Sequence, residues 1–118
     1  TFPSIPASLK ALLKMKLLKK LDQIVEKRRK NAQYYFEQID SESVILPLEK
    51  EYEFNSYHTF VIQVEKRNEL KEFLIKQGIE TVIHYPTPIH LQPAAQELAY
   101  NSGDFPKTEK QAEMILAL

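Results

Sequence analysis

The spacing of hydrophobic residues in the first third of the chain predicts one long amphipathic helix. From Ala7 to about Ile39 there is no glycine or proline, and the helix-favouring residues Leu, Lys, Gln and Glu are frequent. One side of this helix would carry an apolar repeat every seven residues, at Leu18, Val25, Ala32 and Ile39. Because such a helix is longer than most helices of small domains, we expect it to pack along a larger body or a partner.

Two segments in the middle of the chain have the pattern of β-strands. Residues 43–47 form a short apolar run that ends at a proline, which predicts an edge strand, and the charged residues 48–55 predict a connecting loop. Residues 57–65 alternate most clearly between apolar and polar positions, as a half-buried strand does. The buried face of this strand would carry Phe60, Ile62 and Val64.

Residues 68–78 predict a helix with a signal at each end. Asn68 suits the N-cap, and Gly78 suits the left-handed position that follows the last turn. The segment from Ile79 to Tyr85 is rich in β-branched residues and stops at Pro86, which predicts a further strand.

Prolines and turn residues divide the last third of the chain. Pro93 suits the first position of a short helix that extends to Tyr100, and residues 101–104 favour a turn. Thr108 and Gln111 have the spacing of a capping box, so we expect a last helix that continues through the apolar residues 114–118. The pattern as a whole predicts an α+β protein of two layers, a small sheet with helices packed on it.

Composition excludes several classes of protein. The 118 residues include 16 basic and 16 acidic side chains, and a net charge of zero argues against a nucleic-acid partner. The basic cluster 27–30 lies beside acidic residues and is explained by a solvated helix face. There is no cysteine for a disulfide, no apolar run long enough for a membrane, and no signal peptide in residues 1–6. We therefore expect a cytoplasmic protein.

The segment 83–92 is the best candidate for a binding site. His84 and His90 could donate hydrogen bonds to phosphate or sugar hydroxyls, and Tyr85 offers a ring face and a hydroxyl. Composition alone favours the simpler explanation, a proline-stiffened loop with satisfied polar groups. A metal site that also uses His58 is disfavoured, because the three histidines lack ligand spacing. With glycine only at positions 78 and 103, no phosphate-binding glycine loop is present.

The order of five motifs resembles the DegT/StrS-type sugar aminotransferases. The motifs lie in residues 18–35, 56–62 (SYHTFVI), 70–81, 84–92 (HYPTPIHLQ) and 103–109 (GDFPKTE). They match, in turn, the helix joining that family's two domains, its aromatic-His-x-Phe-Val strand, its helix with a Gly-Ile turn, its His-Tyr-Pro loop and its Phe-Pro-x-x-Glu segment.

The resemblance implies an enzyme of the aspartate-aminotransferase fold (fold type I of the pyridoxal-phosphate enzymes), normally a homodimer. Such enzymes use pyridoxal phosphate to move an amino group from an amino acid, usually glutamate, to a keto sugar bound to a nucleotide. Residues 1–40 would be the linking helix, and residues 41–118 the small C-terminal domain, cut short at its end. His84, Tyr85 and His90 would contact the sugar nucleotide.

The resemblance also implies that the catalytic and cofactor-binding residues, including the Schiff-base lysine, lie in a large N-terminal domain that this chain lacks. No catalytic, cofactor-binding or metal-ligating residue is therefore expected here, and the fragment alone would be inactive. Residues 5–12 depart from the family's usual entry to the linking helix. Two alternatives stay open: a stand-alone binding or regulatory module of the same fold, and a related pyridoxal-phosphate-dependent sugar dehydratase.

Overall fold

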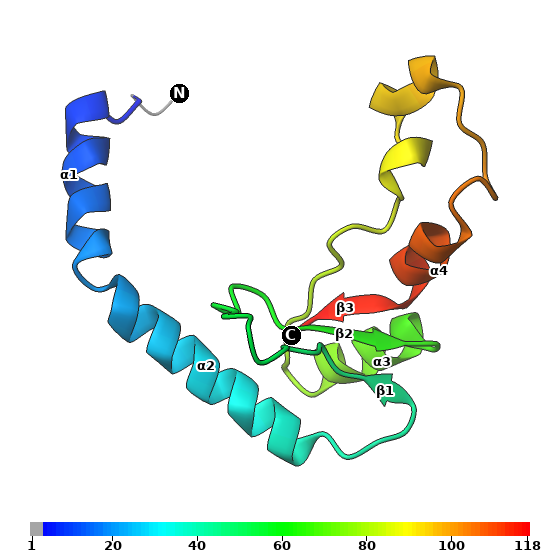
Figure 1. Cartoon of the computed structure of the whole chain (residues 1–118), viewed down its shortest axis with the longest axis horizontal. Helices are drawn as coiled ribbons and strands as arrows, with labels where there is room; N and C mark the ends of the chain where they lie inside the picture. The colour runs from blue at the N-terminus through cyan, green and yellow to red at the C-terminus, as the bar shows by residue number, and fades with distance from the viewer. Residues whose placement is uncertain (1–3) are drawn as a thin grey trace.

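Three short antiparallel strands form the sheet of the computed structural model, which describes residues 4–118 (Figure 1). Their order across the sheet is β1 (Val44–Ile45), β2 (Val61–Val64) and β3 (Ile115–Ala117). Strand β1 is at the edge, as predicted, and its Val44 pairs with Val64 of β2. The other neighbour of β2 is β3, in which Leu116 pairs with Ile62.

The hydrophobic core lies between this sheet and two helices. The strand predicted for residues 57–65 is shorter in the structure, because residues 57–60 and Glu65 lie outside β2. The predicted alternation of burial is confirmed: Ile62 and Val64 of β2 are buried, as is Phe60 just before it, while Val61 and Gln63 are only half-buried. Leu116 of β3 is fully buried. The helices contribute Ala32, Tyr35 and Phe36 from α2 and Leu70 and Leu74 from α3. Burial of one strand face against helices is the arrangement expected of an α+β protein, and that prediction is confirmed.

The single long helix predicted for residues 7–39 is wrong, because the structure has two helices at an angle (Figure 1). Helix α1 is Ala7–Leu18 and helix α2 is Leu21–Gln38. At the break, the Lys20 amide bonds to the Leu17 carbonyl, three residues back, so the last turn of α1 tightens and the axis changes direction. Helix α1 buries none of its side chains against residues 4–118, whereas α2 packs on the core, so no packing among these residues keeps the two collinear. Residues 1–3 lie outside the described part of the chain.

Helix α3 (Arg67–Lys76) ends as the sequence predicts but begins differently. Gly78 has a φ of +79°, the Gly78 amide bonds to the Ile75 carbonyl, and the Ile79 amide reaches the Leu74 carbonyl at 2.9 Å. These are the two hydrogen bonds of a Schellman motif. Asn68 as N-cap is wrong: it lies inside the first turn, and its Oδ1 accepts from Arg67 Nε at 2.7 Å instead.

The strand predicted for residues 79–85 shrinks to one bridge. Val82 and Ala117 exchange two backbone hydrogen bonds, of 3.0 and 2.8 Å, and the neighbouring residues do not extend the pairing. Strand β3 offers an edge of only three residues, and just its Ala117 end lies beside this segment. The prediction of a regular strand is therefore wrong, although the segment does meet the sheet.

The last third of the chain contains two 3-10 helices and one α-helix. They are η1 (Ile89–Leu91), η2 (Pro93–Leu98) and α4 (Pro106–Met114). Pro93 begins η2, as predicted, but η2 ends before the predicted Tyr100. The predicted capping box is wrong, because α4 begins two residues before Thr108 and its N-cap residue is Phe105.

The expectation that the last helix continues through residues 114–118 is also wrong. The chain leaves α4 after Met114 and enters the sheet as β3. Short apolar runs suit a buried strand and a buried helix equally well by pattern, and here the pairing of Leu116 with Ile62 decides the outcome.

Candidate functional site

His84 and Tyr85 lie at the start of a segment that runs out from the sheet. Val82 bridges to Ala117 of β3, and after it the chain extends to η1 and η2, away from the strands (Figure 1). Both side chains are exposed, Tyr85 by 68%, and their rings lie edge to face with centroids 5.3 Å apart. The two rings are therefore free to contact a ligand from solvent.

His90 has a different environment, because it is buried at 9% exposure. Its Nε2–H donates to Glu109 Oε1 at 3.0 Å, and its ring lies 4.8 Å from that of Phe105. The structure thus brings His84 and Tyr85 together, and it buries His90 separately, with one ring nitrogen already bound to a carboxylate.

Glu109 is a further residue of this region, and its role is not evident from the sequence. Its oxygens accept hydrogen bonds from the Gly103 amide at 2.8 and 3.0 Å and from the Ser102 hydroxyl at 3.1 Å. The backbone hydrogen bond from Gly103 lowers the pKa of Glu109, partial burial opposes this, and His90 and Ser102 lower it further. The signal available in the sequence was the Phe-Pro-x-x-Glu spacing after a glycine turn.

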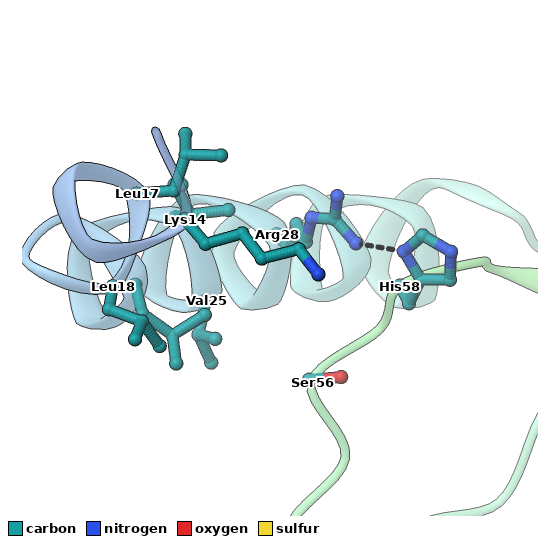
Figure 2. A pocket seen from close by; sticks show the side chains of 9 residues that line it. Lys14, Leu17, Leu18, Val25, Arg28, Ser56 and His58 are labelled. Carbon is teal, nitrogen blue, oxygen red and sulfur yellow. Dashed lines mark hydrogen bonds between the residues drawn. The ribbon is translucent and has the colours of Figure 1, made fainter. Parts of the chain in front are cut away.

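A second feature is an open groove of about 610 Å³ beside α1 and α2 (Figure 2). Its floor is apolar, and it is lined by Lys14, Leu17, Leu18, Leu21, Ile24, Val25, Arg28, Ser56 and His58. Figure 2 shows the Arg28 guanidinium pointing at the His58 ring, and Nη1 donates to Nδ1 at 2.6 Å. His58 therefore carries its proton on Nε2 in this arrangement. The lining contains two cations and no carboxylate.

An ion pair fixes the loop before His58 onto α2. Arg29 donates two hydrogen bonds to Glu49, of 2.8 and 3.1 Å, and its guanidinium lies 4.4 Å from the centre of the Phe54 ring. Glu49 also accepts from the Asn55 amide and the Tyr57 hydroxyl. The hydrogen bonds from Arg29, followed by the one from Asn55, lower the pKa of Glu49 to about 2.

Replacing Glu49 by glutamine should flatten the pH dependence of stability in acid. The pKa of Glu49 is lowered from 4.5 to about 2, so its contribution to folding is complete above pH 4.5 and is lost as the pH falls toward 2. Urea unfolding of the wild type, measured about every half pH unit from pH 6 to pH 2, should show this loss of stability. Glu51→Gln, an exposed neighbour, should keep the wild-type slope. Equal slopes in all three proteins would contradict the role of Glu49.

The described residues offer no ready-made metal site and no membrane helix. Within residues 4–118, no three His, Asp or Glu side chains lie close enough together to hold a metal ion, and His58, His84 and His90 have the separate surroundings given above. No helix in the same range is both long and apolar enough to cross a membrane.

Comparison with known proteins matches almost the whole chain to one family. Residues 7–118 match the DegT/DnrJ/EryC1/StrS aminotransferase family. The chain is 40% identical over 101 residues to a pleiotropic regulatory protein of Geobacillus stearothermophilus, a match that covers 83% of this chain and 27% of that protein. It is 35% identical to a dTDP-3-amino-3,6-dideoxy-alpha-D-galactopyranose transaminase of Aneurinibacillus thermoaerophilus. This match covers 92% of this chain and 29% of that protein.

Solved structures give the same result. The crystal structure of S. venezuelae DesV in complex with a ketimine intermediate superposes with a TM-score of 0.83 and 32% identity, over 92% of this chain and 29% of DesV. An aminotransferase from Brucella abortus gives a TM-score of 0.78 and 30% identity, over 88% of this chain and 28% of that protein. The chain thus spans less than a third of the length of each of these four proteins.

Proposed function

Because the chain belongs to the DegT/DnrJ/EryC1/StrS aminotransferase family, we propose that it is part of an enzyme that aminates nucleotide-bound keto sugars. The amino donor would be an amino acid, such as glutamate, and the whole enzyme would be a cytoplasmic homodimer. The observation that carries the proposal is the superposition on DesV, which holds a ketimine intermediate and matches this fold over 92% of the chain. The similarity to a dTDP-sugar transaminase supports the same class of substrate.

The domain division is part of this proposal. Residues 1–40, in which α1 and α2 lie, would link a large domain to the small domain 41–118. The coverage of only 27% and 29% of the relatives' length supports a further domain in the whole enzyme. The exposure of apolar side chains along α1, including Leu18 at 64%, supports a covering partner for that helix.

Pyridoxal phosphate would be held mainly by the remainder of the enzyme. A lysine that forms a Schiff base must lie in an enclosed pocket, since desolvation makes its amine reactive. Within residues 4–118 every lysine is exposed except Lys71, which is half-buried. The absence of a buried lysine among these residues supports a Schiff-base lysine elsewhere in the enzyme, and the proposed task of this chain is to bind the sugar nucleotide.

The segment 84–90 would provide that binding surface. His84 and Tyr85 are exposed, adjacent and able to donate hydrogen bonds to hydroxyl or phosphate oxygens. Two prolines, Pro86 and Pro88, restrict the backbone between Tyr85 and His90, so the free energy needed to order the loop on binding is small. His90 would contribute from the buried side of the segment.

Alanine at His84, Tyr85 or His90 should raise the KM for the sugar nucleotide in the full-length enzyme. Loss of one hydrogen bond to a charged or hydroxyl group corresponds to a rise of about tenfold, with a smaller change in kcat. Tyr52→Ala is a matched control, because this tyrosine is also exposed but lies in the loop 48–55. Steady-state kinetics with varied sugar nucleotide would measure the effect. If all three variants keep the wild-type KM, the assignment of the loop is wrong.

A regulatory binding protein of the same fold is the second candidate. The relative from Geobacillus stearothermophilus, at 40% identity, is named for regulation rather than for catalysis. The two candidates differ in one measurable property: a protein that contains this chain either transfers an amino group to a keto sugar nucleotide or does not.

A further inference from the structure

Three segments of the chain meet at the carboxylate of Glu109. The first is the segment that leaves the sheet at Val82 and contains His90, and the second is the turn 101–105. The third is the first half of α4, which carries Glu109 itself. The Glu109 side chain accepts from His90 Nε2 at 3.0 Å and from the backbone amides of Gly103 and Phe105 at 2.8 and 3.4 Å.

Aromatic rings also pack next to the His90 ring. Phe105 lies 4.8 Å from His90, and Tyr100 packs edge-on against Phe105 at 5.0 Å. The imidazole is thus fixed between a carboxylate and a ring, with only 7% of its side chain exposed. These contacts restrict the His90 side chain to one orientation, and they thereby restrain the backbone at residue 90.

The exposed residues 84 and 85 lie between two anchors. The first anchor is the pair of backbone hydrogen bonds between Val82 and Ala117, and the second is the contact of His90 with Glu109. Pro86 and Pro88 stiffen the stretch between the anchors, and Gln92 Nε2 donates to the Thr87 carbonyl at 3.3 Å. Loss of the second anchor would leave this stretch held at one end.

We propose that Glu109 is a positioning residue, which acts through His90 to hold His84 and Tyr85 in place for the sugar nucleotide. This inference rests on the proposed function. Glu109 does not touch the substrate in this arrangement, because its oxygens are occupied by His90, Ser102, Gly103 and Phe105. Its effect would therefore be on substrate affinity and not on the chemical step.

Two substitutions of Glu109 in the full-length enzyme distinguish the effect of its hydrogen bonds from the effect of its negative charge. Glu109→Ala should raise the KM for the sugar nucleotide by about tenfold and change kcat by less than about threefold, because a displaced loop binds the substrate poorly. Glu109→Gln should stay within about threefold of the wild-type KM, because the amide oxygen can still accept from His90 and the amide nitrogen can donate to the Ser102 hydroxyl. Glu113→Ala, an exposed carboxylate four residues later on α4, is the matched control and should change nothing.

A double variant shows whether Glu109 acts through His90. If it does, Glu109→Ala combined with His90→Ala should have the same KM as His90→Ala alone, because each change removes the same anchor. If the rise in KM of the double variant equals the product of the rises in the two single variants, the proposal is wrong. If Glu109→Ala does not fold, Glu109→Asp replaces it in the cycle, since an aspartate is one methylene too short to reach His90 and Gly103 together.

Hydrogen exchange of the full-length protein tests the anchor without any assay of activity. Amides in residues 84–92 should exchange about tenfold faster in Glu109→Ala than in the wild type and Glu113→Ala. Unchanged exchange would overturn the positioning role, as would faster exchange with an unchanged KM. If the wild type has no aminotransferase activity, the proposed function fails, and the exchange result alone then decides whether Glu109 holds the loop.

Discussion

Replacing Leu116 by alanine should lower the free energy of unfolding by about 3 kcal/mol. Leu116 is 0% exposed and pairs with Ile62 of the central strand β2. It belongs to the same cluster as Phe60 and Ala32, so the lost side chain would leave a cavity lined by strand and helix residues. The cost combines lost burial with incomplete collapse around the cavity, which makes it one of the largest single effects expected in this chain.

Urea unfolding of the 118-residue chain, followed by circular dichroism, would measure this loss. Leu48→Ala is the control, because Leu48 is 83% exposed in a loop and should change stability by less than about 0.5 kcal/mol. Leu116→Met conserves volume and should cost less than about 1.5 kcal/mol. Equal stability of Leu116→Ala and Leu48→Ala would contradict the placement of residues 115–117 in the sheet.

Replacing Arg67 by alanine should cost about 2–3 kcal/mol, for a different reason. Arg67 is buried, and its Nη1 donates to the backbone carbonyls of Ala112 and Ile115 at 3.1 and 3.2 Å. The helical hydrogen bonds of α4 end with the Ile115 amide bound to Gln111, so the Ala112 carbonyl depends on a partner from outside the helix. Alanine would leave both carbonyls without that donor in a place that water reaches poorly.

The same unfolding experiment tests Arg67, with Lys66→Ala as the control. Lys66 is the exposed neighbour, and its removal should change stability by less than about 0.5 kcal/mol. Arg67→Lys keeps the charge but lacks the guanidinium fork, so it should recover only part of the loss. If Arg67→Lys were as stable as the wild type, charge at the end of α4, and not the specific hydrogen bonds, would explain the arginine.

Local patterns were sufficient where neighbouring residues alone determine the structure. The alternation of Phe60, Ile62 and Val64 predicted which side chains of β2 and of the residue before it are buried. Gly78 predicted the end of α3, because few other residues adopt a positive φ without strain. The proline at the end of residues 43–47 predicted an edge strand for the same kind of local reason.

The predictions that failed concern contacts between distant parts of the chain. Ile115–Ala117 is a strand because β2, some fifty residues earlier, offers a free edge, and the apolar run itself suits a helix equally well. Asn68 and Thr108 have the residue types of caps, but each lies inside the first turn of its helix, because α3 begins at Arg67 and α4 at Pro106. The Asn68 oxygen accepts from the neighbouring Arg67 side chain, and Glu109 accepts from the Gly103 amide before α4. Helices α1 and α2 separate at Lys19 and Lys20, where no glycine or proline signals a break.

The candidate site was predicted as a segment but not as an arrangement. The residues 84–90 stood out by their mixture of imidazole, aromatic and proline residues, and the structure does expose His84 and Tyr85 side by side. The burial of His90 against Glu109, across nineteen positions of sequence, could not be read from spacing. The hydrogen bond between Arg28 and His58 spans thirty positions and was missed for the same reason.

The most direct test of the account is an amino-transfer assay on the full-length protein that contains this chain. The protein, loaded with pyridoxal phosphate, would be mixed with glutamate and a dTDP-bound keto sugar, and the products would be separated and identified by mass. We expect an amino sugar nucleotide and 2-oxoglutarate from the full-length protein, and no product from residues 1–118 alone. A full-length protein that binds the sugar nucleotide but never aminates it would contradict the account and favour the regulatory function, and a deoxygenated sugar without amino transfer would identify a dehydratase.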